Sequence, residues 1–192
     1  LLLGLAASGH CLVMCGGISA ALGIATATAV LVGQAAGRHD PRGVRRAGAL
    51  GIGLATGFMC LSALLFWLAP QVVIGLFVDL NAPQNLELVR NAVVFLGIAA
   101  MFQLVDGMQV TAQGALRGLK DTRVPMLLTL VAYWLVGIAS GLVLTFVMDL
   151  GPRGMWFGLV AGLAVAAALL VQRFVRLSGR ATSGQWGADA AE

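Results

Sequence analysis

Five long apolar runs constrain this chain more than any other feature of its sequence. They occupy residues 11–33, 48–69, 91–115, 124–148 and 155–172. A helix of about 20 apolar residues crosses the roughly 30 Å hydrocarbon core of a bilayer. Because lipid offers the backbone no hydrogen-bond partners, such runs must form helices. The sequence therefore predicts an all-α, polytopic membrane helix bundle with about five transmembrane helices.

Composition agrees with this prediction and excludes several functions. Hydrophobic residues make up 59% of the 192 residues and charged residues only 10%, against about 25% charged residues in soluble domains. The net charge of +4 comes from cations beside the apolar runs, so we expect no nucleic-acid partner. No nucleophile–base pair, phosphate-binding loop or paired intramembrane carboxylates point to an enzyme.

The basic residues predict an orientation. Ten of the twelve fall in alternate connectors or after the last run, which the positive-inside rule makes cytoplasmic. The sequence thus predicts a multi-pass protein of the cell inner (plasma) membrane, with its first residue outside and its C-terminal tail inside. These ten residues are Arg38, Arg42, Arg45, Arg46, Arg117, Lys120, Arg123, Arg173, Arg176 and Arg180.

The connectors give the expected domain organisation. Residues 1–176 form the transmembrane bundle, and residues 177–192 form a polar, disordered cytoplasmic tail. Residues 34–47 read as a connector that turns at Asp40-Pro41. The apolar segment 72–78 is too short to span, so it either extends the second helix or lies in the outer interface, and the third helix restarts after Pro83.

Small residues recur within the runs, often four apart, which places them on one helix face and favours close packing between helices. They are Gly51, Gly53 and Gly57, then Gly137 and Gly141, and finally Gly154, Gly158 and Gly162.

One charged side chain, that of Asp106, lies well inside a predicted span. It is eleven residues before Arg117, or about 16 Å along a helix. A carboxylate at this depth costs on the order of 2.5–3.5 kcal/mol. We therefore expect Asp106 to face a cavity or a partner group.

Three glutamines continue a polar stripe around this carboxylate. Gln103, Gln109 and Gln113 lie three or four residues apart with Asp106, on one face of the helix. The stripe fits a protonatable or cation-binding carboxylate whose hydrogen bonds are shared with amides. It also fits a structural aspartate bonded to a neighbouring helix. A proton or a sodium ion suits one carboxylate better than a divalent metal does, and we expect no other cofactor.

Four blocks of sequence together resemble transporters of the multidrug and toxic-compound extrusion (MATE) family, of the NorM-like type. They cover roughly residues 20–176, in the family's order. The blocks are Gly33-Gln34-Ala-Ala-Gly37, like the end of the eighth helix; Gln103-Leu-Val-Asp106-Gly-Met-Gln109 with Gly114-Ala-Leu-Arg117-Gly-Leu-Lys120, like the tenth; Tyr133-Trp134-Leu-Val-Gly137, like the eleventh; and Gly154-Met-Trp156-Phe-Gly158, like the twelfth.

The resemblance implies a C-terminal half of a twelve-helix, two-lobe antiporter that rocks between outward-open and inward-open states. Such proteins exchange organic cations and drugs for sodium ions or protons. The match makes Asp106 the cation-coupling carboxylate and places Gln103, Gln109, Gln113 and Tyr133 along the substrate or cation pathway. The implied partners are membrane lipids, small organic cations or drugs, and the N-terminal lobe and seventh helix, which this chain lacks. Ile138-Ala139-Ser140 stands where the family's eleventh helix usually has a proline.

A short segment near the beginning resembles a different family. Gly9-His10-Cys11 followed by Met14-Cys15-Gly16-Gly17 is similar to a motif of sulfite-exporter and urease-accessory-like membrane proteins. The imidazole, thiols and thioether of this segment are soft metal ligands. A transporter or accessory protein for sulfur or metal species, using His10, Cys11, Met14 and Cys15, is thus an alternative function. A relative that flips lipid-linked sugars is another.

Overall fold

The computed structural model describes residues 2–80 and 82–182, with side chains from residue 19 to residue 179. These residues form helices, and no strand occurs among them. Five helical segments are long and apolar enough to cross a membrane: Ser19–Gly37, Pro41–Leu68, Pro83–Gly118, Arg123–Val147 and Pro152–Gly179. The predicted all-α bundle with five spans is confirmed.

The first two spans form a helical hairpin with a short connector. Helix α1 (Leu2–Gly37) and helix α2 (Pro41–Leu68) are separated by three residues. His39 adopts a left-handed conformation with φ 54°, and the Asp40 carboxylate accepts a 2.9 Å hydrogen bond from the Gly43 amide. The predicted turn at Asp40-Pro41 is correct. The expected connector of residues 34–47 is too long, because helical hydrogen bonding continues beyond the apolar run into the arginine-rich segment.

Helix α3 (Pro70–Gly75) follows α2 after Ala69, and a short 3₁₀ turn, η1 (Pro83–Asn85), precedes α4 (Leu86–Gly118). The side chains of Val73 and Ile74 are buried. Val73 packs with Ala63 and Phe66 of α2 and with Ala100 of α4. The segment after the second span is therefore a short helix that covers the end of the α2–α4 pair.

The fourth span is continuous but its helical form changes along its length. It comprises α5 (Arg123–Val131), the π-helical η2 (Ala132–Ile138), α6 (Ala139–Leu142) and the π-helical η3 (Val143–Val147). The Ser140 hydroxyl bonds back to the carbonyls of Val136 and Gly137. Wider π turns are frequent at functional sites. Here η2 begins one residue before Tyr133.

The last span, α7 (Pro152–Thr182), ends later than predicted. The expected boundary between bundle and tail at residue 177 is therefore too early, because the helix continues for six residues beyond 176. Residues 183–192 of the predicted tail lie outside the described residues.

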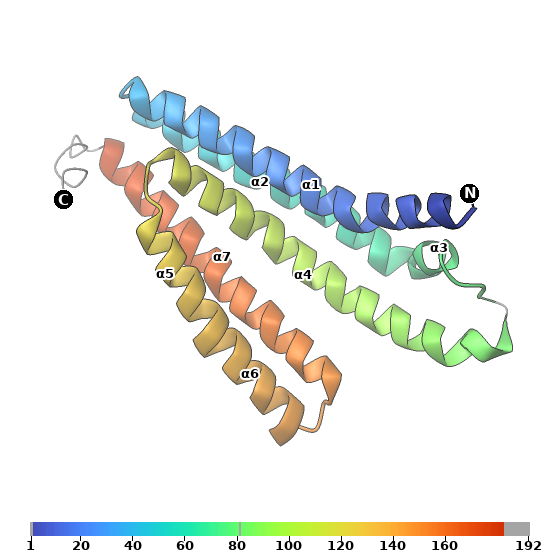
Figure 1. The fold of residues 1–192 in the computed structure, drawn as a ribbon. Helices are drawn as coiled ribbons and strands as arrows, with labels where there is room; N and C mark the ends of the chain where they lie inside the picture. Colours follow the sequence, from blue (N-terminus) through green and yellow to red (C-terminus); the bar gives the residue numbers. More distant parts are fainter. Residues whose placement is uncertain (1, 81, 183–192) are drawn as a thin grey trace.

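Helix α4 occupies the middle of the bundle and contacts α1, α2 and α7, whereas the fourth span packs mainly against α7 (Figure 1). The main core lies near the α4–α5 connector, where four helices meet. Its buried residues are Val32, Ala35, Val44, Ala112, Ala115, Leu116, Leu170 and Phe174. From this core, the α5–α6 and α7 pair diverges from α1 and α2 toward the opposite end (Figure 1).

Glycines allow the fourth span and α7 to pack backbone to backbone. A Cβ atom on Gly158 would lie 2.3 Å from the Gly141 backbone, and one on Gly162 would lie 2.7 Å from the Gly137 Cα. The predicted close packing is correct for these glycines. It is wrong for Gly53 and Gly57, which have nothing within 4 Å of their Cβ positions, because they lie on the outer face of α2.

We predict that Gly158→Ala destabilises the bundle, because the new methyl group would overlap the Gly141 backbone. Overpacking of this kind costs about 1–3 kcal/mol. Thermal unfolding in detergent, followed by size-exclusion chromatography, should show a lower midpoint than for the wild type. Gly23→Ala is the matched control, since nothing lies within 4 Å of the Cβ position of Gly23. An equal loss in both variants would contradict the packing argument.

Candidate functional site: a polar seam on α4

Polar side chains on α4 face two neighbouring spans. Asp106 is only partly exposed at the middle of α4, and Gln109 one turn later is almost fully buried, with 4% of its surface exposed. No hydrogen bond or ion pair connects the Asp106 carboxylate to the described residues. This leaves the carboxylate oxygens available to a ligand within an otherwise apolar segment.

The three glutamines bond to other helices rather than to Asp106. Ser62 of α2 donates a 2.9 Å hydrogen bond to Gln103 Oε1. Tyr133 of η2 donates a 2.9 Å hydrogen bond to Gln109 Oε1. The side-chain amide of Gln113 donates to the Thr129 hydroxyl at 3.1 Å. The hypothesis that the amides share the hydrogen bonds of Asp106 is therefore wrong for the described structure, because each amide is oriented by another span.

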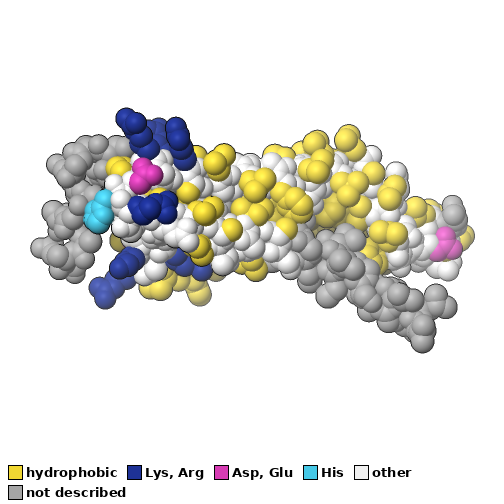
Figure 2. Space-filling model, turned by 90° about the horizontal axis from the view of Figure 1, so that it is seen from above, with side chains coloured by type: hydrophobic (Ala, Val, Ile, Leu, Met, Phe, Trp, Pro, Cys, Tyr) yellow, Lys and Arg dark blue, Asp and Glu magenta, His cyan; other side chains and the backbone are white. Residues whose placement is uncertain are grey.

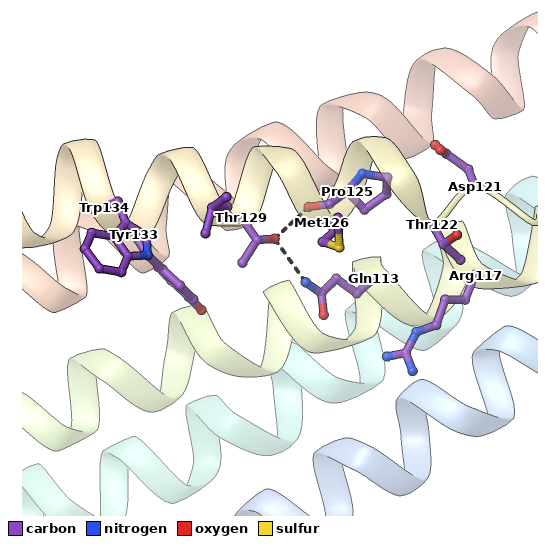
Figure 3. Close-up of a pocket in the computed structure, with 10 residues that line it drawn as sticks. Gln113, Arg117, Asp121, Thr122, Pro125, Met126, Thr129, Tyr133 and Trp134 are labelled. Atoms are coloured by element: carbon purple, nitrogen blue, oxygen red, sulfur yellow. Dashed lines mark hydrogen bonds between the residues drawn. The ribbon is translucent and has the colours of Figure 1, made fainter.

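The hydrogen bond between Gln109 and Tyr133 also brings the phenol close to the charged residue. Tyr133 lies within electrostatic range of Asp106. Thr129 precedes Tyr133 by four residues, so both side chains project from one face of the fourth span toward α4 (Figure 3). Of the five predicted site residues, the structure places Asp106, Gln109, Gln113 and Tyr133 along the seam between α4 and the fourth span. Gln103 faces α2 instead.

A cleft of about 450 Å³ continues this seam toward the α4–α5 connector (Figure 3). Gln113 and Tyr133 line it, whereas Gln103, Asp106 and Gln109 lie outside its lining. The complete lining combines cationic, anionic, hydroxyl, apolar and aromatic side chains: Gln113, Arg117, Asp121, Thr122, Pro125, Met126, Thr129, Leu130, Tyr133 and Trp134. An amphipathic organic ion fits such a mixture of aromatic and polar groups.

An ion pair joins Asp121, a lining residue in the α4–α5 connector, to α7. Arg173 of α7 donates to the Asp121 carboxylate at 2.5 Å. Asp121 follows the left-handed residue Lys120, whose φ is 60°, so the tight turn after α4 points its carboxylate at α7. Both side chains are partly exposed, and the contribution of such a pair to stability is at most about 1 kcal/mol.

Sequence reasoning missed Ser62, Thr129 and the Asp121–Arg173 pair. The sequence could have indicated Thr129 as a site residue, because it lies one helical turn before Tyr133 in an apolar run. The indication for Ser62 is weaker, since it is only a lone hydroxyl in the middle of the second span. The partner of Asp121 lies 52 residues away, and no spacing rule connects the two.

The alternative metal motif lies in the first part of α1, away from the seam in the sequence. The backbone of His10, Cys11, Met14 and Cys15 belongs to α1, but their side chains are outside the described residues. Among the side chains that are described, no group of three or more metal-ligating residues comes together.

The comparisons with known proteins decide the family. The MatE family model matches residues 5–143 of this chain. The chain belongs to the MatE family. The matched region also includes residues 8–17, which carry the alternative motif.

Two curated relatives show how much of such a protein is present. The "Probable multidrug resistance protein NorM" of Deinococcus radiodurans is 54% identical over 154 residues, which are 80% of this chain and 34% of the relative. A protein of the same name from Brucella suis is 49% identical over 155 residues, or 81% of this chain and 33% of the relative. The MatE chain spans about a third of the length of these relatives.

Solved structures agree on the fold. An inward-facing multidrug resistance MATE family transporter of the MOP superfamily superposes with a TM-score of 0.76 at 20% identity, covering 90% of this chain and 39% of that one. The eukaryotic MATE transporter AtDTX14 superposes with a TM-score of 0.70 at 20% identity, covering 84% and 36%. The bundle therefore has the fold of part of a MATE transporter.

We predict that the bond between Tyr133 and Gln109 couples the fourth span to α4. Tyr133→Phe leaves the almost fully buried Gln109 oxygen without its donor, which costs about 1–3 kcal/mol. A double-mutant cycle with Gln109→Met, followed by thermal unfolding, should give a smaller loss for the double variant than the sum of the single losses. Additive losses would show that the two side chains are not coupled.

Proposed function

We propose that this MatE chain is part of the C-terminal lobe of an efflux antiporter that exports multiple drugs and organic cations. The observation that carries the proposal is Asp106, a carboxylate without a hydrogen-bonded partner among the described residues, in the middle of an apolar span. Its place beside a seam of amide and phenol groups supports a coupling role. The names of the NorM relatives support multidrug substrates.

In this proposal, a sodium ion or a proton neutralises Asp106 in one step of the cycle, and an organic cation competes for the same negative charge. Because ion and substrate bind different charge states of the carboxylate, each shifts the conformational equilibrium of the transporter. Gln109 and Tyr133 hold the polar surface beside Asp106 in place, and the cleft beside Gln113 accommodates the body of the substrate. Gln103 supports the same helix from the α2 side.

The chain would act together with a longer protein. The partners are an N-terminal lobe and a seventh helix, which together with these five spans make two bundles that rock around a central site. The protein lies in the inner (plasma) membrane, and the cationic end of the bundle faces the cytoplasm. That end carries the connectors α1–α2 and α4–α5 and the end of α7.

The efflux experiment uses the full-length protein that contains this chain, expressed in cells loaded with ethidium under imposed sodium or proton gradients. We predict that Asp106→Asn abolishes gradient-driven efflux, because the amide can neither be protonated nor bind sodium as a carboxylate does. The gradient that drives the wild type identifies the coupling ion.

Asp149→Asn is the matched control for this substitution. Asp149 lies in the opposite connector, with φ 53°, a conformation that asparagine tolerates. The Asp149→Asn variant should retain efflux at equal expression. Efflux that survives Asp106→Asn would remove Asp106 as the coupling site. Absence of efflux in the wild type would favour a flippase or a sulfur or metal transporter.

The orientation has its own test. We predict that single cysteines at Arg45 and Asp149, placed in a cysteine-free background, react from opposite sides of the membrane. A membrane-impermeant maleimide added to intact cells should label the cysteine at 149 and not the one at 45, whereas inverted vesicles should give the reverse. Labelling of the cysteine at 45 and not the one at 149 in intact cells would show that the proposed topology is inverted.

A further inference from the structure

Three arginines on the outer face of α2 form a cationic site that no part of the proposed transport mechanism uses. Arg42, Arg45 and Arg46 are exposed and line a surface hollow together with Ala49. Their spacing of three and four residues places all three guanidinium groups on one helix face. Figure 2 shows Lys and Arg side chains gathered at this end of the molecule.

None of these arginines forms an ion pair with the described residues. The first turn of α2 contains no acidic residue, and the N-cap carboxylate of Asp40, which accepts a hydrogen bond from the Gly43 amide, offsets only one of the three positive charges. The positive end of the helix dipole adds to the three charges. Like charges this close repel one another, so an anion bound at this position would relieve an unfavourable arrangement. Guanidinium groups bind phosphate in bidentate fashion.

A strip of small residues continues from the arginines along the same face of α2. Ala49, Gly53 and Gly57 follow at intervals of four residues, and nothing lies within 4 Å of the Cβ positions of the two glycines. Leu50 and Leu54, which follow Ala49 and Gly53 in the sequence, are 72% and 64% exposed. The strip extends about 12 Å from Ala49 to Gly57, into the apolar part of the span.

We propose that this face of α2 binds an anionic phospholipid, with its phosphate on Arg42, Arg45 and Arg46 and an acyl chain along Ala49, Gly53 and Gly57. A lipid matches both parts of the face at once, because it joins a phosphate to an apolar chain. A helix of another protein, or of the rest of the full-length protein, would cover the strip but would also have to bring acidic residues to the arginines.

The test measures lipid binding on the full-length protein that contains this chain, in phosphatidylcholine nanodiscs doped with spin-labelled phosphatidylglycerol. The immobilised fraction of the label reports the bound lipid. Each Arg→Gln substitution at 42, 45 or 46 should weaken binding roughly fivefold, which corresponds to about 1 kcal/mol per cation near a membrane surface. The immobilised fraction of spin-labelled phosphatidylcholine should change less with the same substitutions.

The charge-matched control is Lys120→Gln, Arg123→Gln and Arg176→Gln, three exposed cations at the same end of the bundle. This triple variant should retain binding. If it loses as much as the Arg42, Arg45 and Arg46 triple variant, the attraction is diffuse and the site is overturned. The experiment reads lipid binding alone, so its outcome is independent of efflux.

The strip is tested separately by Gly53→Leu with Gly57→Leu, which replaces the small residues with bulky ones while leaving the arginines intact. Immobilisation of the spin-labelled acyl chain should fall several-fold. Unchanged immobilisation would overturn the acyl-chain part of the proposal. Single cysteines at 53 or 57 that cross-link two copies of the protein would assign the strip to a second copy and overturn the lipid site.

Discussion

The close contact between α4 and α1 is the constraint on which the rest of this bundle depends. A Cβ atom on Gly114 would lie 2.4 Å from the Ala25 carbonyl oxygen, and one on Gly118 would lie 2.5 Å from that of Ala29. Two backbones that approach this closely gain dispersion contacts, which drive helix association in lipid, where the hydrophobic effect between helices is absent. The contact lies beside the main core, so it fixes α4 at the point where α1, α2 and α7 also meet it.

With α4 fixed on that side, its other faces can carry polar groups without unfolding the helix. Gln103 is held by Ser62 on α2, whereas Gln109 and Gln113 are held by Tyr133 and Thr129 on the fourth span. These bonds satisfy side chains that would otherwise be costly in lipid. The same seam leaves a carboxylate in mid-span, which the bundle tolerates because packing elsewhere on α4 supports the helix.

Sequence predicted the features that depend on span length and on short-range residue patterns. The five spans, the turn at Asp40-Pro41 and the glycine contacts between the fourth span and α7 follow from span length, capping and small-residue spacing. The ends of the helices did not follow, because arginines at the end of a membrane helix can remain helical while their charges reach water. Nor did the π turns or the Asp121–Arg173 pair, which depend on packing between distant segments. Periodicity placed Gly53 and Gly57 on one face of α2 but could not show whether another helix covers that face.

Binding at the Asp106 carboxylate and bonding between helices are carried by different side chains of the polar stripe. If the glutamines bonded Asp106, a proton or ion arriving at the carboxylate would have to displace amides, and each displacement would cost a hydrogen bond. Gln103 is instead bonded to α2, and Gln109 and Gln113 are bonded to the fourth span, so neutralising Asp106 breaks none of those bonds. The bond between Gln109 and Tyr133 nevertheless connects the helix of Asp106 to the fourth span, which packs mainly on α7. The hydrogen bond between Gln109 and Tyr133 therefore gives a direct path from α4 to the fourth span and α7, on the side of α4 opposite its close packing with α1.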